Sequence, residues 1–236
     1  MKSIVVDKRI SEEMSQELVR LGLSPIYLES YSALGKAVAS HPDTLLFKYK
    51  DRLFFDKGYE REHPEVLRRI REAAPTLRLI PTPDALGAVY PEDTRYNALL
   101  TENGLFLREK SASGAILALK DEGVEITPVK QGYPACTTLT FKKSALTADR
   151  GMAAALLKSG ISVTLIREGF ISLPPHEYGF IGGASFVLEG FVYFFGDYRL
   201  HPDSVIIENA IKSEGLIPIS LGTSPLVDLG GAIVIE

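Results

Sequence analysis

The chain has 236 residues, of which 45% are hydrophobic and 24% are charged, and its formal net charge is −4. This composition is typical of a globular protein with a sizeable core, and the negative charge argues against a dedicated nucleic-acid-binding protein. No apolar run reaches the ~18 residues of a membrane-spanning helix. The single cysteine, Cys136, and an N-terminus without a secretory pattern favour a location in the reducing cytoplasm.

Five stretches of the sequence have the apolar spacing or the capping residues of helices. They cover residues 10–22, 60–74, 111–122, 150–159 and 202–214. In the first of them, Ile10, Met14, Leu18 and Leu21 fall on one helical stripe. Four of the helices end in a glycine that favours a left-handed cap, at Gly22, Gly123, Gly160 and Gly215, and a β-rich run follows each of these.

An apolar run that ends in a charged corner precedes each predicted helix. The corners lie at Asp7, Asp56, Arg108, Asp149 and Asp197, roughly every 40–50 residues, and such a period indicates a repeat protein. A second strand-like run precedes the corner in residues 44–50, 97–102, 137–143 and 184–189. The N-terminal copy lacks this run, whereas residues 226–236 form a strand-like run that no helix follows. The four corner aspartates are expected to cap the turns and helices that follow them.

We therefore predict one α/β domain over residues 1–236, built from five strand–strand–helix–strand units about a pseudo-fivefold axis. Residues 226–236 complete the unit that begins with residues 1–9, and this pairing closes the ring. An open solenoid would instead need polar capping repeats at both ends. Two long proline-containing loops, residues 79–94 and 169–183, are expected to pack across one mouth of the ring, where function tends to reside.

Three segments resemble a known superfamily, the pentein or guanidine-modifying fold, and look most like a bacterial branch of it. They are HPDTLLF (41–47), YGFIGGASF (178–186) and LVDLGGAIVI (226–235). The superfamily includes arginine and agmatine deiminases, amidinotransferases, dimethylarginine hydrolases and a non-catalytic ribosome anti-association factor. The resemblance implies a five-bladed α/β propeller whose functional residues surround the central axis.

Alignment back from each corner identifies the residue of each unit that lies nearest the axis. These unit-opening residues are Asp43, Asn97, Cys136, Gly183 and Asp228. Their neighbours His41, Tyr96, Tyr133 and Ser185 are expected to line the same mouth. Gly182 and Gly183 have two interpretations, because a missing side chain leaves room either for a neighbouring side chain or for a ligand.

Catalytic penteins use a thiolate to attack the guanidinium carbon, carboxylates to hold the cation and a histidine to move protons. The resemblance therefore implies Cys136 as nucleophile, His41 as general acid/base, and Asp43 and Asp228 as ligands of the cation. Asn97, Tyr133, Gly183 and Ser185 would contact the substrate. The activity would be that of a hydrolase or deiminase, or of an amidinotransferase, acting on a C–N bond of a guanidine- or amidine-like substrate.

No cofactor is expected, and no metal, because one cysteine and four scattered histidines give no pair at zinc-ligand spacing. The partner is expected to be a small molecule, and neither a membrane nor a nucleic acid. The basic residues are interleaved with acids, as on solvated helix faces. The sequence does not indicate an oligomeric state.

The chain departs from the enzyme pattern in one respect that leaves a second hypothesis open. The superfamily enzymes carry the catalytic cysteine in the last unit, whereas Cys136 lies in a middle unit and LVDLGGAIVIE contains none. Cys136 would then be an inert residue at the start of a buried strand, and His41-Pro42-Asp43 a turn. In this second hypothesis the protein is a non-catalytic pentein that binds a metabolite or a macromolecular partner such as the ribosome.

Overall fold

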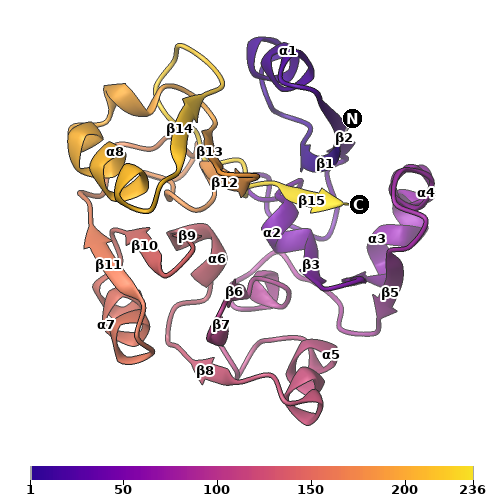
Figure 1. Ribbon diagram of the computed structural model, residues 1–236. Helices are drawn as coiled ribbons and strands as arrows, with labels where there is room; N and C mark the ends of the chain where they lie inside the picture. The colour runs from indigo at the N-terminus through magenta and orange to yellow at the C-terminus, as the bar shows by residue number, and fades with distance from the viewer. Residues whose placement is uncertain (1, 236) are drawn as a thin grey trace.

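The computed structural model describes residues 2–235, so Met1 and Glu236 of the predicted domain lie outside the described residues. Five three-stranded sheets surround a central axis like the blades of a propeller (Figure 1). In every sheet the first strand runs antiparallel to the central strand and the third runs parallel to it. The predicted five-bladed α/β propeller of strand–strand–helix–strand units is therefore confirmed.

The elements follow one another in the same order in each blade. The blade closed by the termini contains β15 (Ile233–Ile235), β1 (Lys2–Asp7), α1 (Glu12–Arg20) and β2 (Leu23–Leu28). The second contains α2 (Pro42–Leu45), β3 (Leu46–Tyr49), β4 (Arg52–Asp56), α3 (Lys57–Glu62), α4 (Pro64–Ala73) and β5 (Arg78–Thr82). The third contains η1 (Glu92–Thr94), β6 (Leu99–Thr101), β7 (Gly104–Leu107), α5 (Gly114–Leu117), η2 (Ala118–Glu122) and β8 (Ile126–Pro128). The fourth contains α6 (Pro134–Thr137), β9 (Thr138–Phe141), β10 (Ser144–Thr147), α7 (Arg150–Lys158) and β11 (Ser162–Leu165). The fifth contains β12 (Ser185–Leu188), β13 (Phe191–Phe194), η3 (Tyr198–Leu200), α8 (Ser204–Ser213) and β14 (Ile217–Ser220).

The two ends of the chain complete one blade, as predicted. Strand β15 pairs antiparallel with β1, so that Ser3 lies opposite Ile235 and Val5 opposite Ile233. The strand predicted over residues 226–236 is much shorter, because Gly230 and Gly231 have φ values of 69° and 68°, which an extended strand does not contain. Residues 226–232 are therefore an irregular segment that approaches the axis before β15 begins.

Two helices differ from those that the sequence predicts. The helix predicted over 60–74 is divided into α3 and α4 at His63, because the proline that follows disfavours helical backbone angles at that position. The helix predicted over 111–122 contains one α-helical turn, α5, and continues as the 3₁₀ segment η2. In α1, Ser11 caps the first turn, and the predicted stripe residues Met14 and Leu18 are buried.

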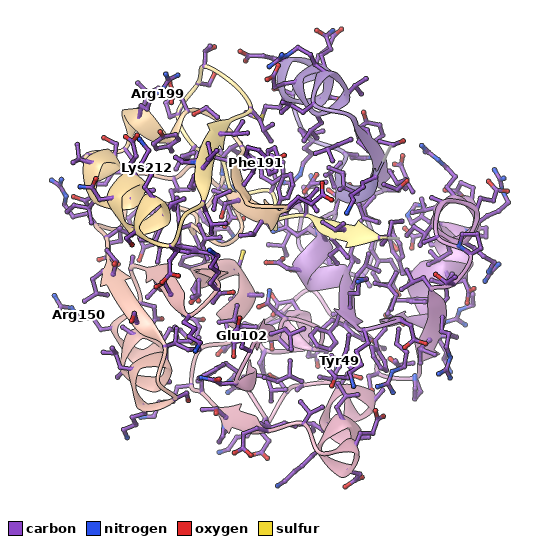
Figure 2. The ribbon with its side chains drawn as sticks, viewed as in Figure 1. Tyr49, Glu102, Arg150, Phe191, Arg199 and Lys212 are labelled. Carbon is purple, nitrogen blue, oxygen red and sulfur yellow. The ribbon has the colours of Figure 1, made fainter. Side chains whose placement is uncertain are left out.

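The corner aspartates have the capping role that the repeat predicts. Their side chains accept hydrogen bonds from backbone N–H groups at the start of the following turn: Asp7 from Arg9, Asp56 from Gly58, Asp149 from Met152 and Asp197 from Arg199. The central strands that end at these corners are almost entirely buried, whereas charged side chains such as Arg150, Arg199 and Lys212 project from the rim (Figure 2). No helix within residues 2–235 is long and apolar enough to cross a membrane.

Hydrogen bonds between neighbouring blades hold the unit-opening segments together at the axis. Ala135 N–H donates to Asn97 Oδ1 at 2.9 Å, and Gly183 N–H donates to the carbonyl of Cys136 at 2.9 Å. The carbonyl of Gly183 accepts from Leu229 N–H at 2.9 Å, and Asp43 N–H donates to the carbonyl of Gly230 at 3.1 Å. These contacts fix the backbone beside each predicted site residue.

Candidate active site

The structure brings together Cys136 and Asp228, which open two different blades. Both oxygens of the Asp228 carboxylate lie 3.4 Å from the Cys136 sulfur, and the thiol donates to them. The carboxylate also accepts from Phe180 N–H at 2.9 Å and from Gly230 N–H at 3.0 Å, which fix its orientation. Cys136 itself lies in the short helix α6 and not at the start of the following strand, where the sequence places it.

His41 completes this group from the N-cap position of α2. Its Nδ1 lies 3.9 Å from Asp228 Oδ1, and its Nε2 lies 3.8 Å from Asp7 Oδ2. The side chain is fully buried, and neither ring nitrogen has a hydrogen-bond partner among residues 2–235. His41 is therefore held between two carboxylates at the centre of the ring.

Asp7 is a member of the site that sequence reasoning missed. The repeat identifies it as a corner acid, and the structure shows that it also faces His41 from the first blade. Its fully buried carboxylate pairs with Arg9 and accepts from the Ser40 hydroxyl at 2.7 Å. The position of Ser40 directly before His41 is the only sequence signal that links the two, and it depends on the fold.

Asp43 and Asn97 are buried beside Cys136. Thr44 Oγ1 donates to Asp43 Oδ1 at 3.3 Å, but Asp43 Oδ2 and Asn97 Nδ2 have no hydrogen-bond partner among the described residues. Buried polar atoms of this kind are rare and commonly belong to a site that receives a ligand, an ion or water. Asp43 thus supplies a second carboxylate at the axis.

The glycines that lead into the fifth blade make room for these side chains. A Cβ atom at Gly183 would lie 1.9 Å from Asp228 Oδ1 and 2.7 Å from the Cys136 sulfur. A Cβ atom at Gly182 would lie 2.1 Å from the carbonyl oxygen of Ala135. Of the two interpretations of this pair, the structure supports the one in which neighbouring groups occupy the space.

The predicted hydroxyl groups have partners within the protein. Tyr133 donates to Asp93 Oδ2 at 2.5 Å, and Ser185 donates to the carbonyl of Ile181 at 2.6 Å. The Tyr96 hydroxyl contacts Thr82 and donates to the carbonyl of Asp84. Tyr133, Ser185 and the buried Tyr96 nevertheless border cavities next to the axis.

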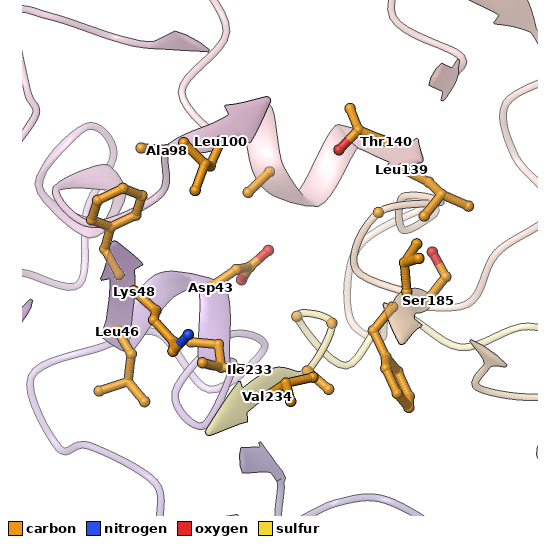
Figure 3. Close-up of a pocket in the computed structure, with 18 of the residues that line it drawn as sticks. Asp43, Leu46, Lys48, Ala98, Leu100, Leu139, Thr140, Ser185, Ile233 and Val234 are labelled. Carbon is orange, nitrogen blue, oxygen red and sulfur yellow. The ribbon is translucent and has the colours of Figure 1, made fainter. Parts of the chain in front are cut away.

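Two cavities reach the axial residues, and they share no lining residue. Cys136 borders a cavity of about 360 Å³ together with Thr44, Tyr133, His176 and Phe180. Asp43 borders a cavity of about 440 Å³ between the first strands of the blades, and its carboxylate points into that space (Figure 3). The long loop over residues 169–183 lines the 360 Å³ cavity, and the other long loop packs beside it, because the Tyr90 ring lies 6.1 Å from the ring of the lining residue Tyr133.

Burial determines the charge state of the site. It raises the pKa of the Cys136 thiol well above its usual value, and the nearby carboxylates of Asp228 and Asp43 raise it further. Burial also lowers the pKa of His41, although Asp228 and Asp7 oppose this shift. The pKa of Asp228 is raised mainly by burial. At neutral pH the thiol is therefore protonated, and the site has too little positive charge to balance its carboxylates.

The stability of the protein is expected to depend on pH through Asp43. Burial raises the pKa of this carboxyl from 3.8 to about 6, so the folded state binds a proton that the unfolded state has lost. The resulting stability is complete below about pH 3.8 and is lost as the pH rises through 6, a change of about 3 kcal/mol. The side chain introduced by Asp43→Asn cannot ionise. As the pH rises through this range, the free energy of unfolding of the variant should therefore increase by about 3 kcal/mol relative to that of the wild type.

Urea unfolding at about pH 4 and pH 7.5 measures this gain, and Asp51→Asn, at an exposed loop position, is the control that should show none. A difference between Asp43→Asn and wild type that stays the same at both pH values would contradict the pKa assigned to this carboxyl.

A family model matches residues 5–233, almost the whole chain. Its description is "Family of unknown function (DUF6873)". The chain belongs to this family. No curated protein sequence matches it.

Solved structures with the same ring of blades include three guanidine-modifying enzymes. The inosamine-phosphate amidinotransferase of Streptomyces griseus has a TM-score of 0.62 at 12% identity, and the comparison covers 100% of this chain and 94% of that one. An amidinotransferase of the saxitoxin pathway from Microseira wollei has a TM-score of 0.58 at 10% identity, with 100% and 94% covered. The dimethylarginine dimethylaminohydrolase of Pseudomonas aeruginosa, complexed with citrulline, has a TM-score of 0.57 at 9% identity, with 94% and 92% covered. This DUF6873 protein therefore has the pentein fold.

Proposed function

We propose that this chain is an enzyme that acts on a C–N bond of a guanidine- or amidine-like small molecule, with Cys136 as its nucleophile. The proposal is supported above all by the Cys136–Asp228–His41 group, in which a thiol, a carboxylate and an imidazole meet at the axis. The fold is also that of the guanidine-modifying enzymes named above. Such enzymes combine a nucleophile, acceptors for the cation and a proton carrier.

Charge favours a planar cation as the ligand. Asp228 and Asp43 are buried within reach of Cys136, and Asp43 Oδ2 has no hydrogen-bond partner within residues 2–235. A guanidinium or amidinium ion presents several N–H donors in one plane, which suits paired carboxylate acceptors. The ligand would reach the thiol through the 360 Å³ cavity that Cys136 borders.

The same cation would activate the nucleophile. Burial and the nearby carboxylates keep the Cys136 thiol neutral, and a bound guanidinium would offset the charge of the carboxylates and lower the pKa of the thiol. The thiol proton would pass to His41 by way of Asp228, which accepts from the thiol at 3.4 Å and whose Oδ1 lies 3.9 Å from His41 Nδ1. Ionisation of Cys136 would then require a cationic substrate. Without that substrate the thiol would stay protonated and unreactive.

The chemistry follows in two steps. The thiolate adds to the amidine carbon, a C–S bond forms, and the C–N bond to the leaving amine breaks as His41 gives that nitrogen a proton. In hydrolysis, water then adds to the same carbon while His41 takes its proton. The C–S bond breaks, and the sulfur leaves as the thiolate with a urea-type product. An acceptor amine in place of water gives amidine transfer.

A panel of guanidino and amidino compounds tests this proposal on chelator-treated protein. At least one cationic compound should raise the midpoint of thermal unfolding and release an amine or ammonia, whereas its neutral urea analogue should do neither. Asp228→Asn should lose the stabilisation, and Asp51→Asn, an exposed substitution, should keep it. The proposal would be overturned if no cation of the panel stabilised the protein and none gave a product.

The second candidate is a protein that binds a metabolite or a macromolecular partner without chemistry. The observation that favours it is the protonated state of the buried Cys136 thiol, which is no nucleophile until it is ionised. In that case a compound of the panel would stabilise the protein but would be recovered unchanged. Co-sedimentation with ribosomes would support a macromolecular partner.

A further inference from the structure

His41, Cys136 and Asp228 form a group with a second chemical capacity. One ligand atom from each residue, a ring nitrogen, the sulfur and a carboxylate oxygen, lies within 4.8 Å of the other two. All three side chains are buried. The sequence analysis places these residues at the axis but shows no metal-ligand spacing, because Cys136 and Asp228 lie 92 residues apart and the closed ring brings their blades together.

We infer that these three side chains form a zinc site. The donors are one sulfur, one nitrogen and one oxygen, a mixture that Zn²⁺ accepts and that Mg²⁺ and Ca²⁺ do not. Zinc bonds of about 2.0–2.3 Å in a tetrahedron place neighbouring donor atoms about 3.3–3.6 Å apart. The sulfur lies 3.4 Å from each Asp228 oxygen, His41 Nδ1 lies 3.9 Å from Asp228 Oδ1, and a ring nitrogen lies within 4.8 Å of the sulfur, so a shift of the His41 ring toward the sulfur would complete the face.

The unpartnered imidazole of His41 points independently to a missing ligand. A fully buried ring with no hydrogen bond to either nitrogen from the described residues is costly, and a metal ion on Nδ1 would remove the share of that cost that belongs to Nδ1. The Cys136 thiol would lose its proton to solvent on binding, and the positive charge of zinc would compensate the thiolate and Asp228.

The surroundings supply the second layer that zinc sites need. Asp7 Oδ2 lies 3.8 Å from His41 Nε2, on the side of the ring opposite the proposed metal. A carboxylate in that position orients a ligating histidine and increases its basicity. Arg9 and Ser40 hold Asp7, and the N–H groups of Phe180 and Gly230 hold Asp228.

Three protein ligands leave one tetrahedral position open. Cys136 borders the 360 Å³ cavity, which gives room for water or a small ligand at that position. Zinc binding does not depend on the guanidine chemistry. If Cys136 is also the nucleophile, bound zinc occupies the thiolate and must inhibit turnover. This consequence rests on the proposed function.

Zinc titration of the chelator-treated full-length protein, followed by calorimetry, tests the site. We expect one zinc per chain, and a loss of affinity of more than about 100-fold in both Cys136→Ser and His41→Gln, larger than the ~10–100-fold expected for Asp7→Asn. His63→Gln, which changes a histidine far from the axis on the α3–α4 corner, should bind zinc like the wild type. Mg²⁺ should not bind.

Cobalt gives a readout that unfolding cannot imitate. Co²⁺ should produce a thiolate-to-metal absorption band in the wild type and in His63→Gln, and this band should be absent from Cys136→Ser. Thermal unfolding without metal checks that each variant is folded. Equal zinc affinity of Cys136→Ser and wild type, or no zinc bound by wild type, would overturn the site. If the wild type binds no zinc but the metal-free protein turns over a guanidine, the zinc inference fails and the proposed function stands.

Discussion

Gly182→Ala is expected to destabilise the folded protein by about 3 kcal/mol or more, the upper part of the range for overpacked cores. The added Cβ atom would lie 2.1 Å from the carbonyl oxygen of Ala135, 2.6 Å from that of Thr138 and 2.7 Å from that of Cys136. These are backbone atoms of helix α6 and of the first residue of β9, which no rotamer change can move. The substitution therefore pushes the segment that enters the fifth blade away from helix α6, which carries the thiol.

The free energy of unfolding in urea measures this loss. Gly35→Ala is the matched control, because its Cβ would meet only the carbonyl oxygen of Ala88, at an ordinary distance of 3.6 Å. Its stability should stay within about 0.5 kcal/mol of wild type. Equal stability of the two variants would mean that the blades do not approach at Gly182 as closely as described.

Cys136→Ser is expected to remove turnover of any guanidine or amidine substrate by about 1,000-fold or more. The serine hydroxyl is similar in size to the thiol but stays protonated, so it cannot add to the amidine carbon. Asp228, Asp43 and His41 remain in place, and binding of the cation should change little. Steady-state turnover and the ligand-induced shift in thermal unfolding separate the two effects.

Cys136→Ser also has a clear contrary result. If turnover persists at the wild-type rate, the nucleophile is a water molecule or another group, and the covalent step proposed here is wrong. If turnover and ligand stabilisation are both lost while the variant is folded, Cys136 acts in binding. His176→Gln is the control variant, because His176 is exposed at the rim of the same cavity and lies outside the catalytic group.

The repeat made the ring predictable. The corner aspartates Asp56 and Asp149 recur with a strand before and a helix after them, and the strand missing at the N-terminus is found at the C-terminus. Counting back from the corners then placed Cys136 and Asp228 at the axis, where the sulfur and the carboxylate lie 3.4 Å apart. Pseudo-symmetry turns positions that are distant in the chain into neighbours in space.

Local distortions and the second role of Asp7 were not predictable in this way. The strand over residues 226–236 is shortened by Gly230 and Gly231, because a Cβ at Gly230 would lie 2.4 Å from the His41 Cβ. The reason for the irregular segment is therefore a packing contact with another blade. Asp7 has the same local pattern as the other corners, and only its proximity to His41 at 3.8 Å distinguishes it.

The central claim is that the axial carboxylates draw a planar cation to the Cys136 thiol and ionise it there. Alkylation of chelator-treated protein by 2-chloroacetamidine and by the neutral 2-chloroacetamide, followed by intact mass, tests this most directly, because Cys136 is the only cysteine. The account predicts that the cationic reagent labels the native protein much faster, and that Asp228→Asn removes the difference. Equal rates for the two reagents, or labelling by either only after unfolding, would contradict it.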